Sequence, residues 1–154
     1  MSGGASERAP VPFAVESAAV RPLRAAVLRP GRAPEELVYA GDEDPSSLHL
    51  AVAVGEELVG IASVIEDAHP GGGRPGDWRI RGMAVAEGHR RRGIGSALLG
   101  ACESHARSRG GARLWCNARI GARELYLRGA MEDEGEEFEI PGIGTHLLMS
   151  KPLR

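Results

Sequence analysis

Apolar and polar residues alternate over residues 46–65, which is the period of a β-strand. One face of this segment carries Leu48, Leu50, Val52 and Val54. A turn at Gly55–Glu56 separates it from a second apolar run that continues to Ile65. The alternation predicts two antiparallel strands, and the Gly- and Pro-rich residues 66–77 predict a loop after them.

The next segment, residues 78–85, predicts a strand whose two faces exchange part-way. Its apolar residues occupy positions 78 and 80 and then positions 83 and 85. One extra residue in a strand swaps its faces, so we expect a β-bulge at Arg81–Gly82.

Helical spacing is clearest from Ile94 onward. One helix face carries the apolar or small residues 94, 97, 98, 101, 102 and 105. Arg107, Arg109 and the pair Gly110–Gly111 predict where this helix ends. A short amphipathic helix is also expected over residues 21–31.

The remaining elements complete a mixed α/β pattern. We expect a buried strand at 112–118, a helix at 122–130 and two closing strands within 136–150, interrupted at Pro141–Gly142. The chain has 154 residues, which fits one domain. We predict a disordered leader at residues 1–10, which lacks the apolar segment of a signal peptide, and a single domain over residues 11–154.

Composition excludes several classes of protein. The formal net charge of -2 argues against a dedicated nucleic-acid binder. Cys102 and Cys116 are too few and too far apart for a disulfide framework or a Cys-x-x-Cys metal site, and the histidines are scattered. No apolar run approaches the length of a membrane span. We therefore expect a cytoplasmic protein that binds no metal, no nucleic acid and no membrane.

Positive charge is concentrated instead in "HRRRGIGSALL", residues 89–99. This segment joins the bulged strand to the strongest helix, where unpaired N–H groups and the helix dipole favour an anion. Gly93 and Gly95 let a ligand lie against the main chain, and the arginines can bind phosphate oxygens. Such a turn suits a pyrophosphate. The alternative is a solvated basic face with turn-forming glycines.

The spacing of this turn is neither that of a P-loop nor that of a dinucleotide-binding fold. Arg90-x-x-Gly93-x-Gly95, after a bulged strand and opening a helix, resembles the acetyl-CoA signature of the GNAT acetyltransferase superfamily. The order of elements over roughly residues 11–152 is also similar to that family. The resemblance implies an α/β (α+β) fold with a mostly antiparallel sheet of about six to seven strands, flanked by helices and splayed beside the bulged strand.

The resemblance also implies a set of cofactor-binding residues. The main chain of Met83, Ala84 and Val85 would pair with the pantetheine arm of acetyl-CoA. Asn117, at the end of the next strand, would bind the cofactor or fix the strand end. The turn that would hold the pyrophosphate consists of Arg90, Arg91, Arg92, Gly93, Ile94, Gly95 and Ser96.

Catalytic roles follow from the same resemblance. Tyr126 would protonate the departing thiolate, and the backbone N–H of Val85 would polarise the thioester carbonyl. The alternative for Tyr126 is ordinary helix packing. The general base stays open between His146, whose imidazole can accept a proton near neutral pH, and acidic residues such as Glu137, with water as a further route. The other acidic candidates are Glu66, Asp67 and Glu139.

One departure from the family concerns the end of the helix that carries Tyr126. The family usually has a Gly-Phe pair where this chain has Ala130-Met131. Met can fill the space of an aromatic ring, so we expect the fold to be kept, with a helix end and a pocket wall that depart from the family pattern. The acidic run at 132–139 is interpreted first as a solvated turn and second as a rim that attracts a cationic amine.

These observations predict an acetyl-CoA-dependent N-acetyltransferase of a small bacterial subgroup, acting on a primary amine of a small molecule, a peptide or a protein. A non-catalytic CoA-binding sensor or structural module of the same fold is the alternative. A nucleic-acid contact by the arginines is disfavoured, because no aromatic residues are interleaved with them. The oligomeric state stays open, with a homodimer as one alternative.

Overall fold

Seven strands form one sheet in the computed structural model of this chain, which describes residues 10–154. The predicted leader, apart from Pro10, lies outside the described residues. The spatial order of the strands is β1-β2-β3-β4-β5-β7-β6. Their bounds are β1 (Phe13–Val15), β2 (Leu48–Val54), β3 (Glu57–Glu66), β4 (Asp77–Val85), β5 (Arg113–Arg119), β6 (Glu132–Ile140) and β7 (Gly144–Pro152).

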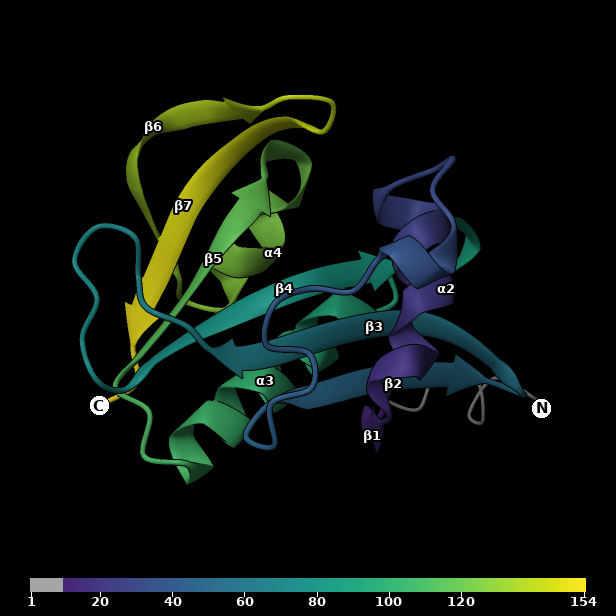
Figure 1. Cartoon of the computed structure of the whole chain (residues 1–154), viewed down its shortest axis with the longest axis horizontal. Helices are drawn as coiled ribbons and strands as arrows, with labels where there is room; N and C mark the ends of the chain where they lie inside the picture. Colours follow the sequence, from purple (N-terminus) through teal and green to yellow (C-terminus); the bar gives the residue numbers. More distant parts are fainter. Residues whose placement is uncertain (1–9) are drawn as a thin grey trace.

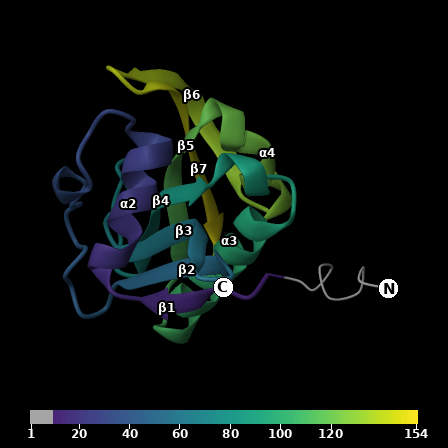
Figure 2. The same cartoon turned by 90° about the vertical axis from the view of Figure 1, so that its right-hand side faces the viewer.

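Helices cover both faces of this sheet. The helices are α2 (Arg21–Leu23), which continues as a π-helical turn (Arg24–Leu28), α3 (Ile94–Ser108) and α4 (Arg123–Arg128). Figure 1 shows the strands of the sheet with the helices around them. Figure 2, turned by 90°, shows α2 on one face of the sheet and α3 and α4 on the other. The predicted fold, a mostly antiparallel sheet flanked by helices, is confirmed. No helix within residues 10–154 has the length and apolar character needed to cross a membrane.

The sheet splits between β4 and β5. All neighbouring strands are antiparallel except these two, which are parallel. They pair only where Asp77–Arg79 face Arg113–Trp115, and beyond that point the rest of β4 has no partner on this side. Figure 1 shows β5, β7 and β6 inclined away from β4, β3 and β2.

The predicted β-bulge lies in β4. Ile61 pairs with Ala84, but Ser63 pairs with Arg81, so β4 has one residue more than β3 over this stretch. Gly82 has a φ of 63°, in the left-handed region that glycine tolerates. The bulge keeps Trp78, Ile80, Met83 and Val85 against the same core cluster.

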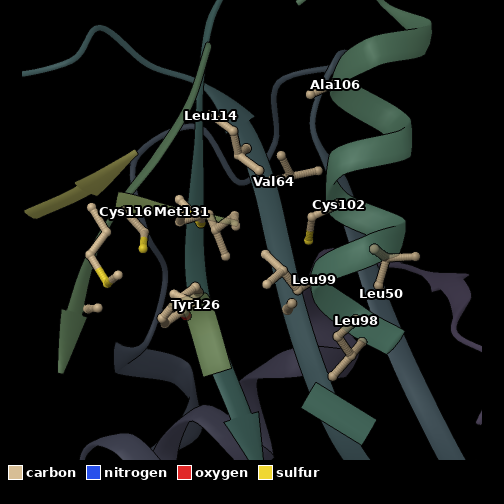
Figure 3. Close-up of a cluster of buried hydrophobic side chains, with 14 of the residues drawn as sticks. Leu50, Val64, Leu98, Leu99, Cys102, Ala106, Leu114, Cys116, Tyr126 and Met131 are labelled. Atoms are coloured by element: carbon tan, nitrogen blue, oxygen red, sulfur yellow. The ribbon is translucent and has the colours of Figure 1, made fainter. Parts of the chain in front are cut away.

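The main core lies between the sheet and α3. Figure 3 shows Leu98, Leu99 and Cys102 of α3 facing side chains of the strands, with Tyr126 of α4 in the same cluster. Gly60 of β3 lets the helix approach closely, because a Cβ at this position would lie 2.4 Å from Cγ2 of Ile94. This contact fixes the N-terminus of α3 beside the split in the sheet.

Two local predictions need correction. The expected helix at residues 21–31 is present over residues 21–28, as one turn of α2 followed by a π-helical turn, but it is not simply amphipathic, because its Arg24 is completely buried and hydrogen-bonded to groups far along the chain. The acidic run at 132–139 is not a turn, because it forms most of β6 at the edge of the sheet. Strand pairing with the apolar β7 overrides the low strand propensity of its acidic residues.

Candidate active site

The split between β4 and β5 opens into two adjoining cavities. The larger has a volume of about 700 Å³ and lies between the end of β4, the N-terminus of α3 and the segment around Ile120. The smaller, of about 190 Å³, extends along the first half of β4 toward β7. Both cavities are lined by Leu28, Met83, Arg119, Ala122 and Ile143, so they meet at these residues.

The N-terminus of α3 forms one wall of the larger cavity. Its N-cap is Gly93, with φ 81° and ψ 6°, and no side chain caps the helix. The first internal hydrogen bond runs from the N–H of Ala97 to the carbonyl of Gly93 (3.0 Å), so the N–H groups of Ile94, Gly95 and Ser96 lack partners within the helix. Together with the helix dipole, they favour an anion here.

Glycine is needed at positions 93 and 95 for two different structural reasons. A Cβ on Gly93 would meet no heavy atom within 4 Å, but its positive φ disfavours any other residue. A Cβ on Gly95 would lie 3.2 Å from Leu125, so this glycine lets α3 and α4 pack closely. Only Gly93 therefore presents bare backbone to open space.

Positive charge surrounds the same wall. Arg90, Arg91 and Arg128 line the larger cavity, and Arg90 Nε donates to the carbonyl of Val85 (3.1 Å). Arg91 has a φ of 65°, and backbone turns of this kind can direct successive N–H groups toward an anion. The site has the donors and the charge that a pyrophosphate needs.

The end of β4 supplies a second set of backbone donors. The N–H of Ala86 donates to the carbonyl of Val59 (2.8 Å), so it points toward β3. Successive N–H groups of a strand point to opposite edges, and the N–H of Val85 therefore points to the edge that β5 has left. The hydrogen bond from Arg90 to the Val85 carbonyl supports this orientation, because the N–H and the C=O of one strand residue point to the same edge of the strand.

Most of the predicted cofactor residues meet around the larger cavity. Its lining includes Met83, Ala84, Val85, Arg90, Arg91, Gly93, Ile94, Gly95 and Ser96. Arg92 is exposed and lies outside this lining. Asn117 lines the smaller cavity instead, which places it on the other side of the junction.

Tyr126 lines the smaller cavity. Its side chain is only 4% exposed and belongs to the main core cluster, close to Cys116 and Met131 (Figure 3). Burial, with a smaller contribution from the neighbouring thiols of Cys116 and Cys102, raises the pKa of Tyr126 well above its ordinary value. The phenol therefore keeps its proton at neutral pH. Burial likewise raises the pKa of both thiols to about 12, so neither is a reactive nucleophile.

His146 of β7 also lines the smaller cavity. Its Nδ1 donates to the carbonyl of Gly144 (2.8 Å), and its ring stacks on Phe138 with the ring centres 5.9 Å apart. The carbonyl fixes the tautomer that carries the proton on Nδ1. Nε2 is left with its lone pair and no hydrogen-bond partner among residues 10–154.

The acidic candidates for a general base lie away from both cavities. Glu137 is exposed on β6 and lines neither of them. Glu66 is exposed at the end of β3, Asp67 pairs with Arg79 (3.2 Å), and Glu139 accepts a hydrogen bond from Thr145. Of the proposed bases, the structure brings only His146 to the cleft.

The departure at Ala130-Met131 has a defined geometry. The N–H of Met131 bonds the carbonyl of Tyr126 and the N–H of Ala130 bonds that of Leu127, both at 3.0 Å, which is the Schellman arrangement at a helix end. Ala130 occupies the left-handed position with a φ of 68°, where glycine is favoured. Met131 is 1% exposed and fills the core beneath the helix.

Sequence reasoning missed the residues that hold the opposite wall of the smaller cavity. Arg24 is fully buried and donates to both oxygens of Asp42 (2.7 and 3.0 Å), to the Leu37 carbonyl (2.8 Å) and to Ser63 Oγ (3.0 Å). Asp42 in turn accepts the N–H of Tyr39 (2.9 Å), whose ring lies 4.0 Å from the Arg24 guanidinium. Their positions in the chain show no motif that could have marked this network.

Comparison with known proteins identifies the family. Residues 18–130 match the family model described as "Acetyltransferase (GNAT) family". The chain belongs to the GNAT family. Its members are acetyltransferases, so the chain is an acyltransferase, and the resemblance seen in the Arg90–Gly95 turn is confirmed.

A relative within this GNAT family is the "Uncharacterized N-acetyltransferase YitI" of Bacillus subtilis (strain 168). It is 36% identical over 132 residues, covering 86% of this chain and 89% of the relative. Similar solved structures include an IAA acetyltransferase from Bacillus cereus ATCC 14579, with a TM-score of 0.72 and 18% identity over 94% of this chain and 99% of that one. An aminoglycoside 6'-N-acetyltransferase complexed with coenzyme A has a TM-score of 0.68 and 16% identity, over 94% and 97% of the two chains. At these identities the structures show the shared fold alone.

Proposed function

We propose that residues 11–154 form one catalytic domain that transfers an acetyl group from acetyl-CoA to a primary amine of a small molecule or peptide. The observation that carries the proposal is the continuity of the two cavities. The larger combines an uncapped helix N-terminus with an open strand edge, and it leads directly to His146 and Tyr126 in the smaller one.

The larger cavity fits the chemistry of CoA. Unpaired N–H groups at Ile94–Ser96 and the guanidinium groups of Arg90 and Arg91 would hold the pyrophosphate. The free edge of β4 at Met83–Val85 would pair with the amide groups of the pantetheine arm. In this pose the thioester end reaches the junction of the two cavities.

Three groups of the chain would carry the transfer. The N–H of Val85 would donate to the thioester carbonyl and stabilise the charge that develops on its oxygen. Nε2 of His146 would accept the proton of the attacking amine, directly or through water. Tyr126, which keeps its proton because its pKa is raised by burial, would donate that proton to the departing thiolate.

The cellular location belongs to the same proposal. Both cysteines are buried free thiols, which suits a reducing compartment such as the cytoplasm.

Thiol release from acetyl-CoA in the presence of an amine panel tests this function. The panel would include amino acids, polyamines, aminoglycosides and short peptides, with mass spectrometry of the product. We expect acceptor-dependent release of CoA and a product heavier by one acetyl group. Binding of acetyl-CoA without release for any acceptor would indicate a CoA-binding module instead, and failure to bind would contradict the proposal.

A further inference from the structure

The smaller cavity is lined by an unusual amount of positive charge. Four guanidinium groups contribute to it, and no residue of its lining is acidic. They come from Arg29, Arg79, Arg81 and Arg119. A cavity built to receive a polycation such as a polyamine would carry the opposite charge.

Only one of these four arginines forms an ion pair with a carboxylate among residues 10–154. Arg79 pairs with Asp67 (3.2 Å) and stacks on Trp115, with its guanidinium 4.7 Å from the ring centre. Arg29, Arg81 and Arg119 have no carboxylate partner among residues 10–154. All three side chains are half-buried, so water compensates their charge only in part.

Burial and mutual repulsion disfavour the charged form of two of these arginines. Burial, together with the neighbouring charge of Arg79, lowers the pKa of Arg81. Burial and the charge of Arg29 act in the same direction on Arg119. Half-buried like charges that repel one another and lack counter-ions are typical of a site for an anion.

Arg81 is held in place for such a role. Its guanidinium lies 4.3 Å from the centre of the Tyr39 ring, and Tyr39 is fixed by the buried Arg24–Asp42 pair. Gly82 makes room for this packing, since a Cβ there would lie 3.0 Å from Arg24 Nε. The nearby network therefore orders Arg81 without forming an ion pair with it.

The acidic run of the chain does not balance these arginines. Glu134 of β6 contacts His69 (3.0 Å) and Ser150, and Asp133 pairs with Arg123 (2.6 Å). The contribution of β6 to the cavity lining is Ile140. The hypothesis of an acidic rim that attracts a cationic amine thus has no support from the lining of this cavity.

From this charge and geometry, we propose that the acceptor is a small amine that carries a carboxylate, with Arg81, Arg29 and Arg119 as the residues that bind the carboxylate. The inference rests on the proposed acetyl transfer and adds the substrate class. A volume of about 190 Å³ is below the roughly 300–1,000 Å³ of pockets for drug-sized ligands, which favours an acceptor of amino-acid size. Guanidinium groups bind carboxylates through paired hydrogen bonds, and this would orient the amine toward His146 and the junction.

The test compares acceptors that carry a carboxylate with acceptors of the same size that lack one. Thiol release would be measured at saturating acetyl-CoA with each of the common L-amino acids and with its carboxamide, which keeps the amine but lacks the negative charge. Phosphoethanolamine, spermidine and kanamycin would be run alongside. We expect at least one amino acid with a kcat/KM about tenfold or more above that of its amide, because a charge-assisted hydrogen bond is lost in the amide.

Variants assign this preference to the arginines. Arg81→Gln should raise KM for the acid about tenfold or more, should leave KM for the amide unchanged and should not alter the acetyl-CoA Kd. Arg81→Lys should recover part of the effect, since it restores the charge but not the paired hydrogen bonds. Arg74→Gln, an exposed loop arginine outside both cavities, is the matched control and should leave all constants unchanged.

Binding of products gives a readout that is independent of turnover. Calorimetric titration of the CoA-loaded protein would compare N-acetyl amino acids with their amides, and the acids should bind more tightly. Equal binding of acid and amide, or of neither, would overturn the inference, as would a preference for phosphoethanolamine, spermidine or kanamycin. Acetyl-CoA binding is measured separately, so loss of the proposed function is distinguished from a wrong substrate class.

Discussion

The two cavities of the cleft are built in different ways. The anion-binding wall of the larger uses the main chain of one continuous segment, from Met83 at the end of β4 to Ser96 in the first turn of α3, while Arg119, Arg128 and other side chains complete its lining. The smaller uses side chains from separate segments, including Arg29, Tyr39, Arg119 and His146. A binding site made of backbone depends on local sequence, whereas one made of side chains depends on tertiary packing. The comparison teaches which part of this enzyme a short motif can specify.

The largest expected effect is a loss of acetyl-CoA affinity, from a change in the backbone wall of the larger cavity. Gly93→Glu should weaken acetyl-CoA binding by at least about a hundredfold, because like charges placed together cost several kcal/mol. Calorimetric titration measures the change. Gly110→Glu is the matched control, since Gly110 has a φ of 78° against 81° for Gly93 and similar open space at the other end of α3. Equal binding by the two variants would show that backbone strain, and not the pyrophosphate site, determines affinity.

The second-largest effect is expected on stability, from a change in the buried Arg24–Asp42 pair behind the smaller cavity. Arg24→Met leaves Asp42 buried without its partner and should lower the free energy of unfolding by about 3–5 kcal/mol. Urea denaturation gives the value. Arg32→Met breaks an exposed pair with Glu36 and should cost less than about 1 kcal/mol. If Arg24→Met does not fold, the double variant with Asp42→Leu should recover stability. No recovery would contradict the role assigned to the pair.

Tyr126→Phe separates catalysis from cofactor binding. We expect kcat to fall about a hundredfold, the low end for loss of a general acid, with little change in the acetyl-CoA Kd because Tyr126 does not line the larger cavity. Steady-state kinetics and titration give the two numbers. Glu124→Gln, an exposed change on the same helix that lines neither cavity, serves as the control and should retain kcat. A Tyr126→Phe enzyme as fast as the parent would remove this residue from the mechanism.

Acid should weaken the buried network beside the smaller cavity through protonation of Asp42. Burial alone would raise the pKa of Asp42, but the Arg24 guanidinium and the N–H of Tyr39 outweigh it and hold this pKa below its ordinary value. The resulting stabilisation is present above the ordinary aspartate pKa near about 4 and is lost as pH falls below it. Unfolding free energies measured between neutral and acidic pH should show this loss, and Asp42→Asn should flatten it. An unchanged slope in the variant would exclude Asp42 as its source.

The smallest effect is a gain in stability. Ala130→Gly removes the strain of a left-handed φ of 68° at the end of α4 and should stabilise the protein by about 1 kcal/mol, measured by urea denaturation. Ala122→Gly, at a position with a φ of -103°, should not stabilise. A loss of stability in Ala130→Gly would mean that the helix ends differently in solution.

Local pattern explains why much of the fold could be predicted. The alternation in β2 and β3, the parity change at Gly82 and the apolar face of α3 each reflect contacts with one sheet face, and the structure confirms all three. The π-helical turn at Arg24 could not be predicted, because the two terminal nitrogens of its buried guanidinium donate to groups from distant segments. The closing strand expected from residue 136 is present, but its start at residues 132–135 was missed for the same reason: pairing with β7 outweighs the acidic composition there.

The candidate site divides in the same way. The Arg90–Ser96 turn follows from its own spacing, since glycine is required at a helix N-cap with positive φ. The arginines of the smaller cavity are ordinary surface residues in the sequence, and only the bulge in β4 and the split sheet bring Arg81 and Arg119 together. Among the proposed bases, spacing could not distinguish His146 from Glu137, because the choice depends on which strand residue faces the cleft.

The central claim is that backbone groups of β4 and α3 hold acetyl-CoA, and amide NMR during a titration with acetyl-CoA tests it most directly. The account predicts that the largest shifts occur at the N–H groups of Val85 and of Gly93–Ser96, with smaller changes along β6. The absence of shifts at these amides under saturating acetyl-CoA, or shifts concentrated elsewhere, would contradict it.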